Sequence, residues 1–414
     1  MISIKEVRLP DLVMAPVSKS HLQRELIISL LAKKSSKLLG DFDSLPADVE
    51  AALTVIKALG AVVNRQKLFI EITPPTNFNR KNLISLNVGE SGFLLRNVAI
   101  FGLIFSETIE IFAQGTLVNR ELHLDQDLFD QLGIVMKSKP NSWPLVLSKK
   151  SKEWPAVINM DASKTSQVAS GLIITLASCN SRSQISFTTV VSRPYLEMTL
   201  ASIRNRGKVC EWNANTIQIE NGRLEGKTIE VLGDWSGAAN LLAMGAIDGS
   251  VTVDGLVSNH NQSDEKILDV LAMYGAKIEK MDKRITARAS EHKAFKFDVT
   301  HCPDLFPVLC VLAATANGES TIMGTNRLLS KESNRLESSL EMLKKMGCVS
   351  KTDGNSITIL GGIHNQEIRI STYKDHRLVL AAVVLSRVTS LKVSVNEFTS
   401  IDKSFPSLKP FVYF

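Results

Sequence analysis

Apolar and polar positions alternate along this chain in a way that predicts helices and strands in turn. Residues 238–247 and 308–316 are runs of small apolar residues, which predict apolar helices. Strands such as residues 108–112 follow helices of this kind, and amphipathic helices such as residues 48–59 also occur. The pattern predicts an α/β (α+β) protein built from a repeated helix, strand, helix, strand unit.

A glycine ends the amphipathic helix in five successive units, and a strand is expected after each one. The glycines recur at intervals of 73, 74, 68 and 72 residues. Glycine suits the position just beyond a helix because it adopts the left-handed conformation without strain. A sixth, shortened unit begins at Arg377. The five glycines are Gly60, Gly133, Gly207, Gly275 and Gly347.

Six units could form one elongated array or two compact domains of three units each. Three units have the size of an ordinary domain, which favours the second arrangement. The loop around residues 222–235 lies between units three and four. We expect an N-terminal domain of residues 16–226 and a C-terminal domain of residues 1–15 together with residues 227–414.

Composition narrows the classes of partner. The net charge is only +6 and 6% of residues are aromatic, so a nucleic-acid surface with base-stacking aromatics is not expected. No apolar run is long enough to span a membrane, and residues 1–14 lack the apolar core of a signal peptide. The five cysteines are scattered without a C-x-x-C pair, which argues against zinc and disulfides. We expect a cytoplasmic protein that binds small anions.

The stretch from Ser330 to Arg335 shows how an anion site could arise. The sequence predicts a helix that begins near Ser330 as N-cap, with Lys331 and Arg335 on one face and Glu332 beside them. Cations at a helix start oppose the helix dipole, so this placement suggests a bound anion. An ordinary charged helix start is the alternative.

Similar groups of cations and hydroxyls occur at other expected helix starts. Each group alone also fits a plain turn or a helix cap, as in the stretch 161–167. At equivalent places in a repeated unit, however, they would line one cleft and bind phosphate and carboxylate groups together. Asp304 and Glu332 are the acid and base candidates among them. The cations are Lys19, Arg24, Arg120, Lys331, Arg335, Arg377 and Lys403.

The motifs resemble those of the EPSP synthase (3-phosphoshikimate 1-carboxyvinyltransferase) family of enolpyruvyl transferases, in the same order and over essentially the whole chain. They are S-K-S-x-x-x-R, a glycine loop ending in Arg96, G-x-x-x-x-R, T-S-Q, S-R-P-Y, G-D-W-S, P-D, K-E-S-x-R, D-H-R and K-S-F-P. The resemblance implies two domains of three repeats, an inside-out α/β barrel each, with a cleft between them. It also implies a monomer without metal or organic cofactor.

The resemblance further implies an enzyme of the shikimate pathway to aromatic amino acids. It transfers the enolpyruvyl group of phosphoenolpyruvate to the 5-hydroxyl of shikimate 3-phosphate and releases phosphate. Residues implied for shikimate 3-phosphate are Lys19, Ser20, Arg24, Thr165, Ser166, Ser192, Tyr195, Asp304, Arg327 and Lys331. Residues implied for phosphoenolpyruvate are Lys19, Gly92, Arg120, Gln167, Arg335, Arg377 and Lys403.

The reaction requires one proton to leave the 5-hydroxyl and one to reach C3 of phosphoenolpyruvate. We assign Asp304 as the base for the hydroxyl and Glu332 as the residue that exchanges a proton with C3. Lys19 would assist at either step. Several neighbours of these residues depart from the usual family pattern: Val17, Glu90, Ser91, Phe93, Leu329 and Asn334.

Three other functions compete with this one. The sister enzyme that acts on UDP-N-acetylglucosamine typically has Lys-Asn in the first motif and a cysteine in the loop of Arg120. This chain has Lys19-Ser20 and no cysteine in residues 115–120, which favours shikimate 3-phosphate. An inactive paralogue would fit the departures, and a non-enzymatic repeat scaffold would carry scattered charge on a concave face.

Overall fold

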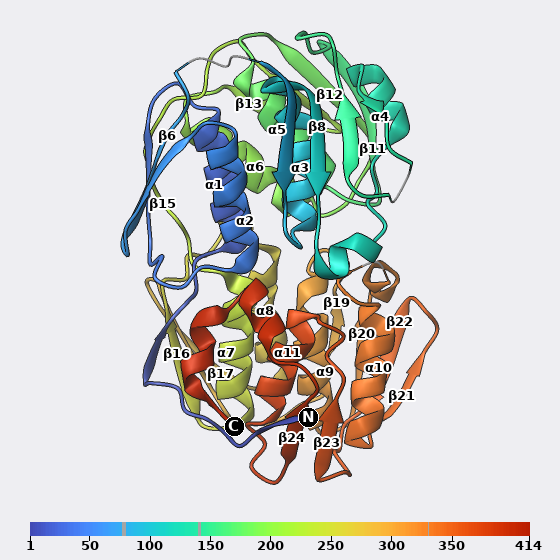
Figure 1. Cartoon of the computed structure of the whole chain (residues 1–414). Helices are drawn as coiled ribbons and strands as arrows, with labels where there is room; N and C mark the ends of the chain where they lie inside the picture. Colours follow the sequence, from blue (N-terminus) through green and yellow to red (C-terminus); the bar gives the residue numbers. More distant parts are fainter. Residues whose placement is uncertain (77–79, 140–141, 330) are drawn as a thin grey trace. The chain divides into compact units, whose positions relative to one another are not determined.

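The computed structural model describes residues 1–76, 80–139, 142–329 and 331–414, and its chain forms two compact units (Figure 1). Unit 1 comprises Met1–Ser18, Ser44–Pro46 and Leu232–Phe414. Unit 2 comprises Lys19–Asp43 and Ala47–Val231. The boundaries predicted from sequence, 15/16 and 226/227, fall a few residues before these positions.

Unit 2 is built from α/β modules that each carry a four-stranded sheet. In the second module β7 pairs parallel with β8, and β8, β10 and β9 continue antiparallel. The third module repeats this order in its sheet β11-β12-β14-β13. The second module contains β7 (Lys81–Asn87), α3 (Gly92–Phe101), η1 (Gly102–Ile104), β8 (Ser106–Phe112), η2 (Gly115–Asn119), α4 (Gln126–Leu132), β9 (Val135–Met136) and β10 (Leu145–Ser148). The third contains β11 (Val157–Ala162), α5 (Gln167–Ser178), β12 (Ser183–Val190), α6 (Arg193–Asn205), β13 (Cys210–Asn213) and β14 (Thr216–Ile219).

The first module of unit 2 takes one strand from far along the chain. β15 (Thr228–Glu230) pairs parallel with β4, which places Thr228 opposite Lys37. Without β15, this sheet would lack the parallel strand that the other modules have at the same edge. The rest of the module is α1 (Lys19–Leu30), β4 (Ser36–Leu39), α2 (Ala47–Ala58), β5 (Val62–Arg65) and β6 (Phe69–Thr73).

Unit 1 follows the same plan. Its first module borrows β3 (Leu12–Met14), which pairs parallel with β16, so residues near the N-terminus belong to this unit. That module continues with α7 (Trp235–Ile247), β16 (Ser250–Asp254), η3 (Ser263–Lys266), α8 (Ile267–Tyr274), β17 (Lys277–Met281) and β18 (Arg284–Arg288). The next contains β19 (Lys296–Asp298), η4 (Pro303–Leu305), α9 (Phe306–Thr315), β20 (Glu319–Met323), η5 (Thr325–Leu328), α10 (Arg335–Met346), β21 (Val349–Thr352) and β22 (Ser356–Leu360). The last contains β23 (Glu367–Ile370), α11 (His376–Leu385), β24 (Lys392–Val395), η6 (Thr399–Lys403) and η7 (Pro406–Phe411), with β1 (Ile2–Ile4) beside β24 and β2 (Glu6–Val7) paired with β25 (Val412–Tyr413).

The repeated module differs from the predicted one. The prediction of a helix, strand, helix, strand unit was wrong in its strand count, because a hairpin follows each ending glycine and a further parallel strand precedes the first helix. Most of these extra strands are short: β18 and β22 have five residues each and β19 has three. An alternation of apolar and polar residues over so few positions is hard to tell from chance, so the sequence signal of these strands is weak.

The five ending glycines adopt the predicted left-handed conformation. Their φ angles are +100° at Gly60, +67° at Gly133, +81° at Gly207, +89° at Gly275 and +78° at Gly347. Any other L residue would be strained at these positions. The predicted ends of the amphipathic helices are therefore confirmed, together with the period of the repeat.

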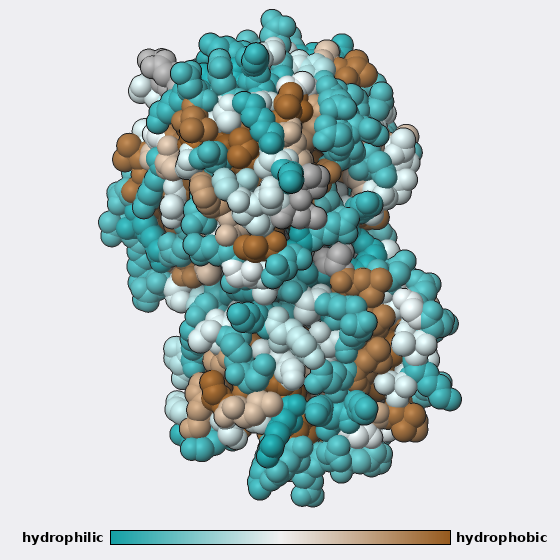
Figure 2. Space-filling view, turned by 45° about the vertical axis from the view of Figure 1, so that its right-hand side comes forward, coloured by the Kyte–Doolittle hydropathy of each residue, from teal (hydrophilic) through white to brown (hydrophobic). Residues whose placement is uncertain are grey.

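Buried helices form the centre of unit 1. All 13 residues of α7 and all 10 residues of α11 are buried, and α9 is buried along nearly its whole length. Their side chains share one apolar cluster with the inner faces of the surrounding strands. The surface seen in Figure 2 is mostly hydrophilic, with apolar residues in small groups. The runs 238–247 and 308–316 were thus correctly predicted as helices, and the structure shows that they are buried. Within the described ranges, no helix is long and apolar enough to cross a membrane.

Helix α10 begins later than predicted. It starts at Arg335, and Asn334 is its N-cap, with the Asn334 side chain accepting a hydrogen bond from the Glu337 N–H at 3.3 Å. The expectation of a helix starting near Ser330 was wrong, and Ser330 itself lies outside the described residues. Asparagine caps as well as serine does, and Glu337 completes an N-x-x-E start signal that was overlooked. Lys331 therefore lies before the helix and does not share a helical face with Arg335.

Candidate active site

Arg24 ties the N-terminal parts of several helices of unit 2 together. Its Nε donates to Thr199 Oγ1 at 2.8 Å, and its Nη2 donates to the Tyr195 carbonyl at 3.2 Å and to Ser170 Oγ at 3.4 Å. Its guanidinium carbon also lies 4.6 Å from the centre of the Phe93 ring. Burial lowers the pKa of Arg24 to about 10, so the group keeps its charge at neutral pH. Helices α1, α3, α5 and α6 thus meet around one buried cation.

Lys19, the first residue of α1, is held at the start of α2. Its Nζ lies 3.0 Å from Asp48 Oδ2. Gln23 fixes the same corner, because its Nε2 donates to the Asp48 carbonyl at 2.9 Å and to Ser91 Oγ at 3.0 Å. The sequence did not single out Asp48, since an acid at a helix start usually only complements the dipole. An anion that binds Lys19 must share it with this carboxylate.

Arg96 links Gly92 to Gln167. Its Nη1 donates to Gln167 Oε1 at 2.8 Å and to the Gly92 carbonyl at 3.2 Å, and its Nε donates to the Leu122 carbonyl at 2.8 Å. A Cβ added at Gly92 would lie 2.8 Å from Arg96 Nη1, so glycine permits this approach. Burial and the charge of Arg120 lower the pKa of Arg96 to about 10. Arg96 was noted as part of a motif, but its role in holding Gln167 was not predicted.

Glu90 anchors the loop that carries Arg120. Its Oε2 accepts from the Thr116 N–H at 2.8 Å and from Thr116 Oγ1 at 2.9 Å, and Thr116 Oγ1 in turn accepts from Arg120 Nη2. Gly115 has φ +54°, and a Cβ there would overlap the Glu90 carboxyl. Arg120 Nε is buried and finds no hydrogen-bond acceptor in the part of the chain that the structure describes. Glu90 departs from the usual family pattern, and in this chain its carboxylate bonds to Thr116 in the loop that carries Arg120.

The hydroxyl residues of unit 2 lie at helix starts. Ser166 is the N-cap residue of α5, but its side chain makes no capping hydrogen bond. Thr165 Oγ1 instead accepts from the Gln167 N–H at 3.2 Å. Ser192 precedes α6 in the left-handed conformation, with φ +52°, which costs a serine on the order of 1–2 kcal/mol. Strain of this kind is often kept at functional sites, because it aims a side chain at a ligand.

In unit 1, two arginines hold Asp304 between them. Arg335 Nη1 lies 2.6 Å from Asp304 Oδ1, and Arg377 Nη2 lies 3.0 Å from Asp304 Oδ2. Arg335 also donates from Nε to Asp375 Oδ2 at 2.8 Å. Burial raises the pKa of Asp304, but the charges of Arg377 and Arg335 outweigh it and hold the pKa well below its usual range. Asp304 is therefore ionised in this state and is a weak base.

Arg377 keeps unused hydrogen-bonding capacity. Its side chain is buried, and its Nε and Nη1 have no acceptor among the residues described. Leaving such donors unsatisfied is costly, so a bound anion that accepts from them would be stabilised. The start of α11 is therefore a candidate position for a bound anion.

Glu332 lies beside His376 and Lys403. Its Oε2 is 2.8 Å from His376 Nδ1 and 3.8 Å from Lys403 Nζ, and Lys403 also donates to the Lys374 carbonyl at 3.0 Å. Glu332 lines an open pocket of about 510 Å³, so it can be reached from outside. His376 belongs to the D-H-R motif, but sequence alone did not pair it with Glu332.

Among the described residues, one group of side chains brings together donor atoms for a metal ion, but their existing bonds do not suit one. Donor atoms of Glu332, Asp375 and His376 lie within 4.8 Å of one another. Both Asp375 oxygens, however, already accept from Arg335, and Oδ1 also accepts from the Arg377 N–H at 2.9 Å. A metal ion there would displace these bonds and lie against two buried cations, so we assign no metal to this cluster.

Two further residues of the predicted set, Lys331 and Arg327, belong to the same module of unit 1 as Asp304. The charge of Lys331 contributes to lowering the pKa of Asp304, after burial and the two arginines. Arg327 lies in η5 and donates from Nη1 to the Thr300 carbonyl at 2.7 Å. Unit 1 therefore brings together Asp304, Lys331, Glu332, Arg335, Arg377 and Lys403.

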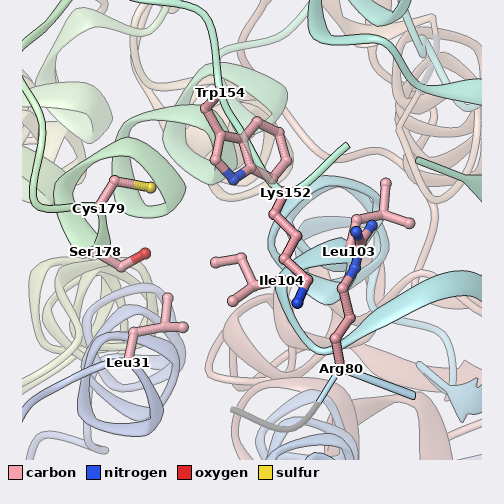
Figure 3. A pocket seen from close by; sticks show the side chains of 8 residues that line it. All are labelled: Leu31, Arg80, Leu103, Ile104, Lys152, Trp154, Ser178 and Cys179. Atoms are coloured by element: carbon pink, nitrogen blue, oxygen red, sulfur yellow. The ribbon is translucent and has the colours of Figure 1, made fainter. Parts of the chain in front are cut away.

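Unit 2 also contains a cavity of about 250 Å³ that no predicted site residue lines (Figure 3). The figure shows the Trp154 ring above the side chains of Lys152 and Ile104, with Arg80 on one side and the Cys179 thiol on the other. The remaining lining residues are Leu31, Leu103 and Ser178. This cavity is separate from both clusters described above.

Comparison with known proteins decides the family. The family model for EPSP synthase (3-phosphoshikimate 1-carboxyvinyltransferase) matches residues 5–410. The chain belongs to this family. The 3-phosphoshikimate 1-carboxyvinyltransferase of Pyrococcus abyssi is 31% identical over 396 residues, covering 95% of this chain and 92% of the relative. That of Methanocorpusculum labreanum is 29% identical over 404 residues, covering 95% and 93%.

Solved structures agree on the fold. An EPSP synthase structure from Acinetobacter baumannii matches with a TM-score of 0.78 at 19% identity, covering 99% of this chain and 96% of that chain. The enolpyruvyl transferase NikO from Streptomyces tendae matches with a TM-score of 0.73 at 13% identity, covering 99% and 95%. Membership of the EPSP synthase family confirms the predicted enzyme class, an enolpyruvyl transferase of the shikimate pathway.

Proposed function

We propose that the two clusters bind shikimate 3-phosphate and phosphoenolpyruvate and carry out the enolpyruvyl transfer of the EPSP synthase family. A bond forms between the 5-oxygen of shikimate 3-phosphate and C2 of phosphoenolpyruvate. The bond from C2 to the phosphate oxygen then breaks, and phosphate leaves. The proposal requires both clusters to engage the same pair of substrates. The observation that carries it is Asp304 held between Arg335 and Arg377, with the charge of Glu332 acting on the same Arg335.

Asp304 is proposed as the base for the 5-hydroxyl. In the unliganded structure its two arginine partners make it a weak base. Phosphoenolpyruvate brings its own carboxylate and phosphate, and we propose that Arg335 and Arg377 turn to these anions. Their charge is then shared, so the pKa of Asp304 rises and the carboxylate can accept the hydroxyl proton. Substrate binding would in this way prepare the base.

Glu332 is proposed to exchange the proton with C3. C3 gains a proton when C2 is attacked, and it loses one when phosphate leaves. A group beside C3 must therefore give a proton in the first step and take one in the second, and we propose that Glu332 does both. The contacts of Glu332 with His376 at 2.8 Å and Lys403 at 3.8 Å provide two further groups that can stabilise either state. Lys19, across from Asp48 in unit 2, would assist at either step.

The remaining residues are proposed to hold the substrates. Hydroxyl and cationic groups from the starts of α1, α5 and α6 suit the phosphate and hydroxyls of shikimate 3-phosphate. The proposed set is Lys19, Ser20, Arg24, Thr165, Ser166, Ser192, Tyr195, Asp304, Arg327 and Lys331. For phosphoenolpyruvate the proposed set is Lys19, Gly92, Arg120, Gln167, Arg335, Arg377 and Lys403. Arg96 is added as the residue that holds Gln167 in place.

A cytoplasmic location and a monomeric state remain predictions. All five cysteines are free thiols, which fits a reducing compartment. Gel filtration with light scattering measures the oligomeric state directly.

The assay for the reaction is phosphate release from phosphoenolpyruvate. We expect release that depends on shikimate 3-phosphate and is absent when UDP-N-acetylglucosamine replaces it. Release with the UDP-sugar alone would favour the sister activity. No release with either acceptor would favour an inactive paralogue. A variant from each unit, Arg24→Ala and Arg377→Ala, should lose the same activity, because both clusters are required.

A further inference from the structure

The cavity of unit 2 shown in Figure 3 lies at the C-terminal ends of three helices whose N-terminal ends carry proposed substrate residues. Leu31 follows α1, Leu103 and Ile104 belong to η1 directly after α3, and Ser178 is the last residue of α5. These helices have 10 to 12 residues, so about 15–18 Å separates their two ends. A ligand in this cavity would therefore not touch the proposed substrate residues.

Hydrogen-bond donors line one side of the cavity. Arg80 donates from Nη1 to the Lys150 carbonyl at 2.8 Å and from Nη2 to the Lys149 carbonyl. Its Nε is buried and has no acceptor among the described residues, which is a costly state for a donor. Figure 3 shows the indole nitrogen of Trp154 turned toward the cavity and the Lys152 ammonium group at the edge of the same space. None of the described lining residues is an acid.

The cations around the cavity are close enough to affect one another. Lys149 Nζ donates to the Leu132 carbonyl at 2.6 Å and lies 4.9 Å from the centre of the Trp154 ring. Burial and the charge of Arg80 lower the pKa of Lys149. Burial also lowers the pKa of Arg80, and Glu107, which does not line the cavity, opposes this shift. A bound anion would offset the repulsion between these cations, whereas a bound cation would increase it.

Balancing the C-terminal ends of the helices is the alternative role for these cations. The contacts do not support it. Arg80 bonds to the carbonyls of Lys149 and Lys150, which follow β10 and belong to no helix. At the end of α5, the Cys179 carbonyl already accepts from Lys208 Nζ at 2.8 Å, and Lys208 does not line the cavity. Helix capping therefore leaves the donors at the cavity unexplained.

The other side of the cavity is apolar, and its size limits what it can hold. Leu31 and Leu103 are buried, and Ile104 lies between them and the Trp154 ring. The volume is about 250 Å³. A cavity of about 150 Å³ is known to take up benzene, so this one has room for an aromatic ring with a short side arm.

We propose that this cavity is a separate binding site for a small monocarboxylate with an aromatic or branched apolar body. The carboxylate accepts hydrogen bonds from Arg80 Nε, Trp154 Nε1 and the Lys152 ammonium group. The apolar body packs against Leu31 and Leu103. This site is independent of the proposed reaction, because none of these residues belongs to either substrate set.

Cys179 lines the cavity and reports on its occupancy. It is partly exposed, whereas the other four cysteines are buried. Burial raises the pKa of the Cys179 thiol, so alkylation by iodoacetamide is followed at about pH 8.5, where more thiolate is present. Peptide mass spectrometry gives the rate at Cys179, with the buried Cys210 as an internal reference. We expect about 5 mM phenylacetate to slow this alkylation at least about threefold, as for a small ligand with a millimolar Kd.

Two further probes separate charge from shape. Phenylacetamide keeps the shape of phenylacetate without its charge, and acetate keeps the charge without the ring. At the same concentration, each should slow the alkylation of Cys179 by less than about 1.5-fold. Equal protection by phenylacetamide would overturn the recognition of a carboxylate. Equal protection by acetate would overturn the need for an apolar body.

Variants test the donors with a matched control. Lys152→Gln should raise the Kd for phenylacetate about two- to fivefold, the range expected for an exposed ion pair. Lys150→Gln changes the net charge equally at an exposed residue outside the lining, and should leave the Kd within about 1.5-fold. Trp154→Phe keeps an aromatic ring but removes the indole donor, and should also weaken binding about two- to fivefold.

Fluorine NMR of para-fluorophenylacetate tests the site without the thiol, and carries the test if Cys179 does not react. The line should broaden with the wild-type chain and narrow again when excess phenylacetate is added. A line that stays narrow, or a Kd unchanged in both Lys152→Gln and Trp154→Phe, would overturn the proposal. Neither measurement uses phosphate release, so a failure of the proposed reaction and a failure of this site are seen separately.

Discussion

Gly92→Ala tests whether the contact between Arg96 and Gln167 supports phosphoenolpyruvate binding. The new Cβ would lie 2.8 Å from Arg96 Nη1 and 3.7 Å from Leu117 Cδ1. Only the first contact is too short, and it involves the end of a flexible side chain. Arg96 therefore has to move, which disturbs its bonds to Gln167 at 2.8 Å and to the Gly92 carbonyl at 3.2 Å.

The magnitude follows from the bonds that are disturbed. A hydrogen bond to a charged group contributes about 1.5–3 kcal/mol, and a displaced rather than deleted arginine should lose about half of this. A loss of about 0.8–1.5 kcal/mol corresponds to a roughly four- to twelvefold higher KM for phosphoenolpyruvate. The KM for shikimate 3-phosphate should stay within about twofold, because Arg24 and its partners are untouched. The free energy of unfolding should change by less than about 1 kcal/mol. Alanine lowers the conformational entropy of the unfolded chain, and this offsets part of the cost of the close contact.

A double-mutant cycle shows whether the effect passes through Arg96. Steady-state kinetics are measured for Gly92→Ala, for Arg96→Ala and for the two changes combined. In the Arg96→Ala background, Gly92→Ala should have little further effect on the KM for phosphoenolpyruvate. Fully additive effects, or an unchanged KM in the single variant, would refute this reasoning.

Two further predictions concern the stability of each unit. Burial raises the pKa of Glu25, but the hydrogen bond from His21 and the charge of Arg206 outweigh it and lower the pKa to about 2. Its stabilisation is therefore present above pH 4.5, the ordinary pKa, and is lost as the pH falls to about 2. Glu25→Gln should cost about 3–5 kcal/mol in urea unfolding and remove this acid-dependent loss, whereas Glu50→Gln, in an exposed ion pair, should cost under about 1 kcal/mol. Asn334→Ala removes the N-cap of α10 and should cost about 1 kcal/mol by thermal unfolding, while Asn334→Ser should restore most of it.

Features fixed by backbone geometry could be predicted from the sequence. A position in the left-handed conformation after a helix is usually occupied by glycine. The five glycines that end the amphipathic helices therefore marked the repeat correctly. Continuous apolar runs likewise gave the buried helices α7 and α9. Both signals are local, and both arise from strong preferences of single residues or single helices.

Features that depend on distant partners could not be predicted in the same way. The positions of Asp48 and His376 beside the clusters follow from packing between elements, and nothing in their own stretches reveals these positions. The start of α10 was misplaced because the Asn334 cap was read as an unexplained departure. The charge of Arg335 at a helix start suggested a bound anion, but in the structure Asp304 and Asp375 from other elements balance it.

The most direct test of the proposed mechanism is the turnover of Glu332→Gln. Glutamine keeps the shape of the side chain and can still bond to His376, but it cannot carry the proton to and from C3. We predict that kcat for phosphate release falls by at least about 100-fold, while both KM values stay within about threefold. Near-normal turnover in this variant would contradict the role of Glu332 and with it the assignment of the cluster in unit 1.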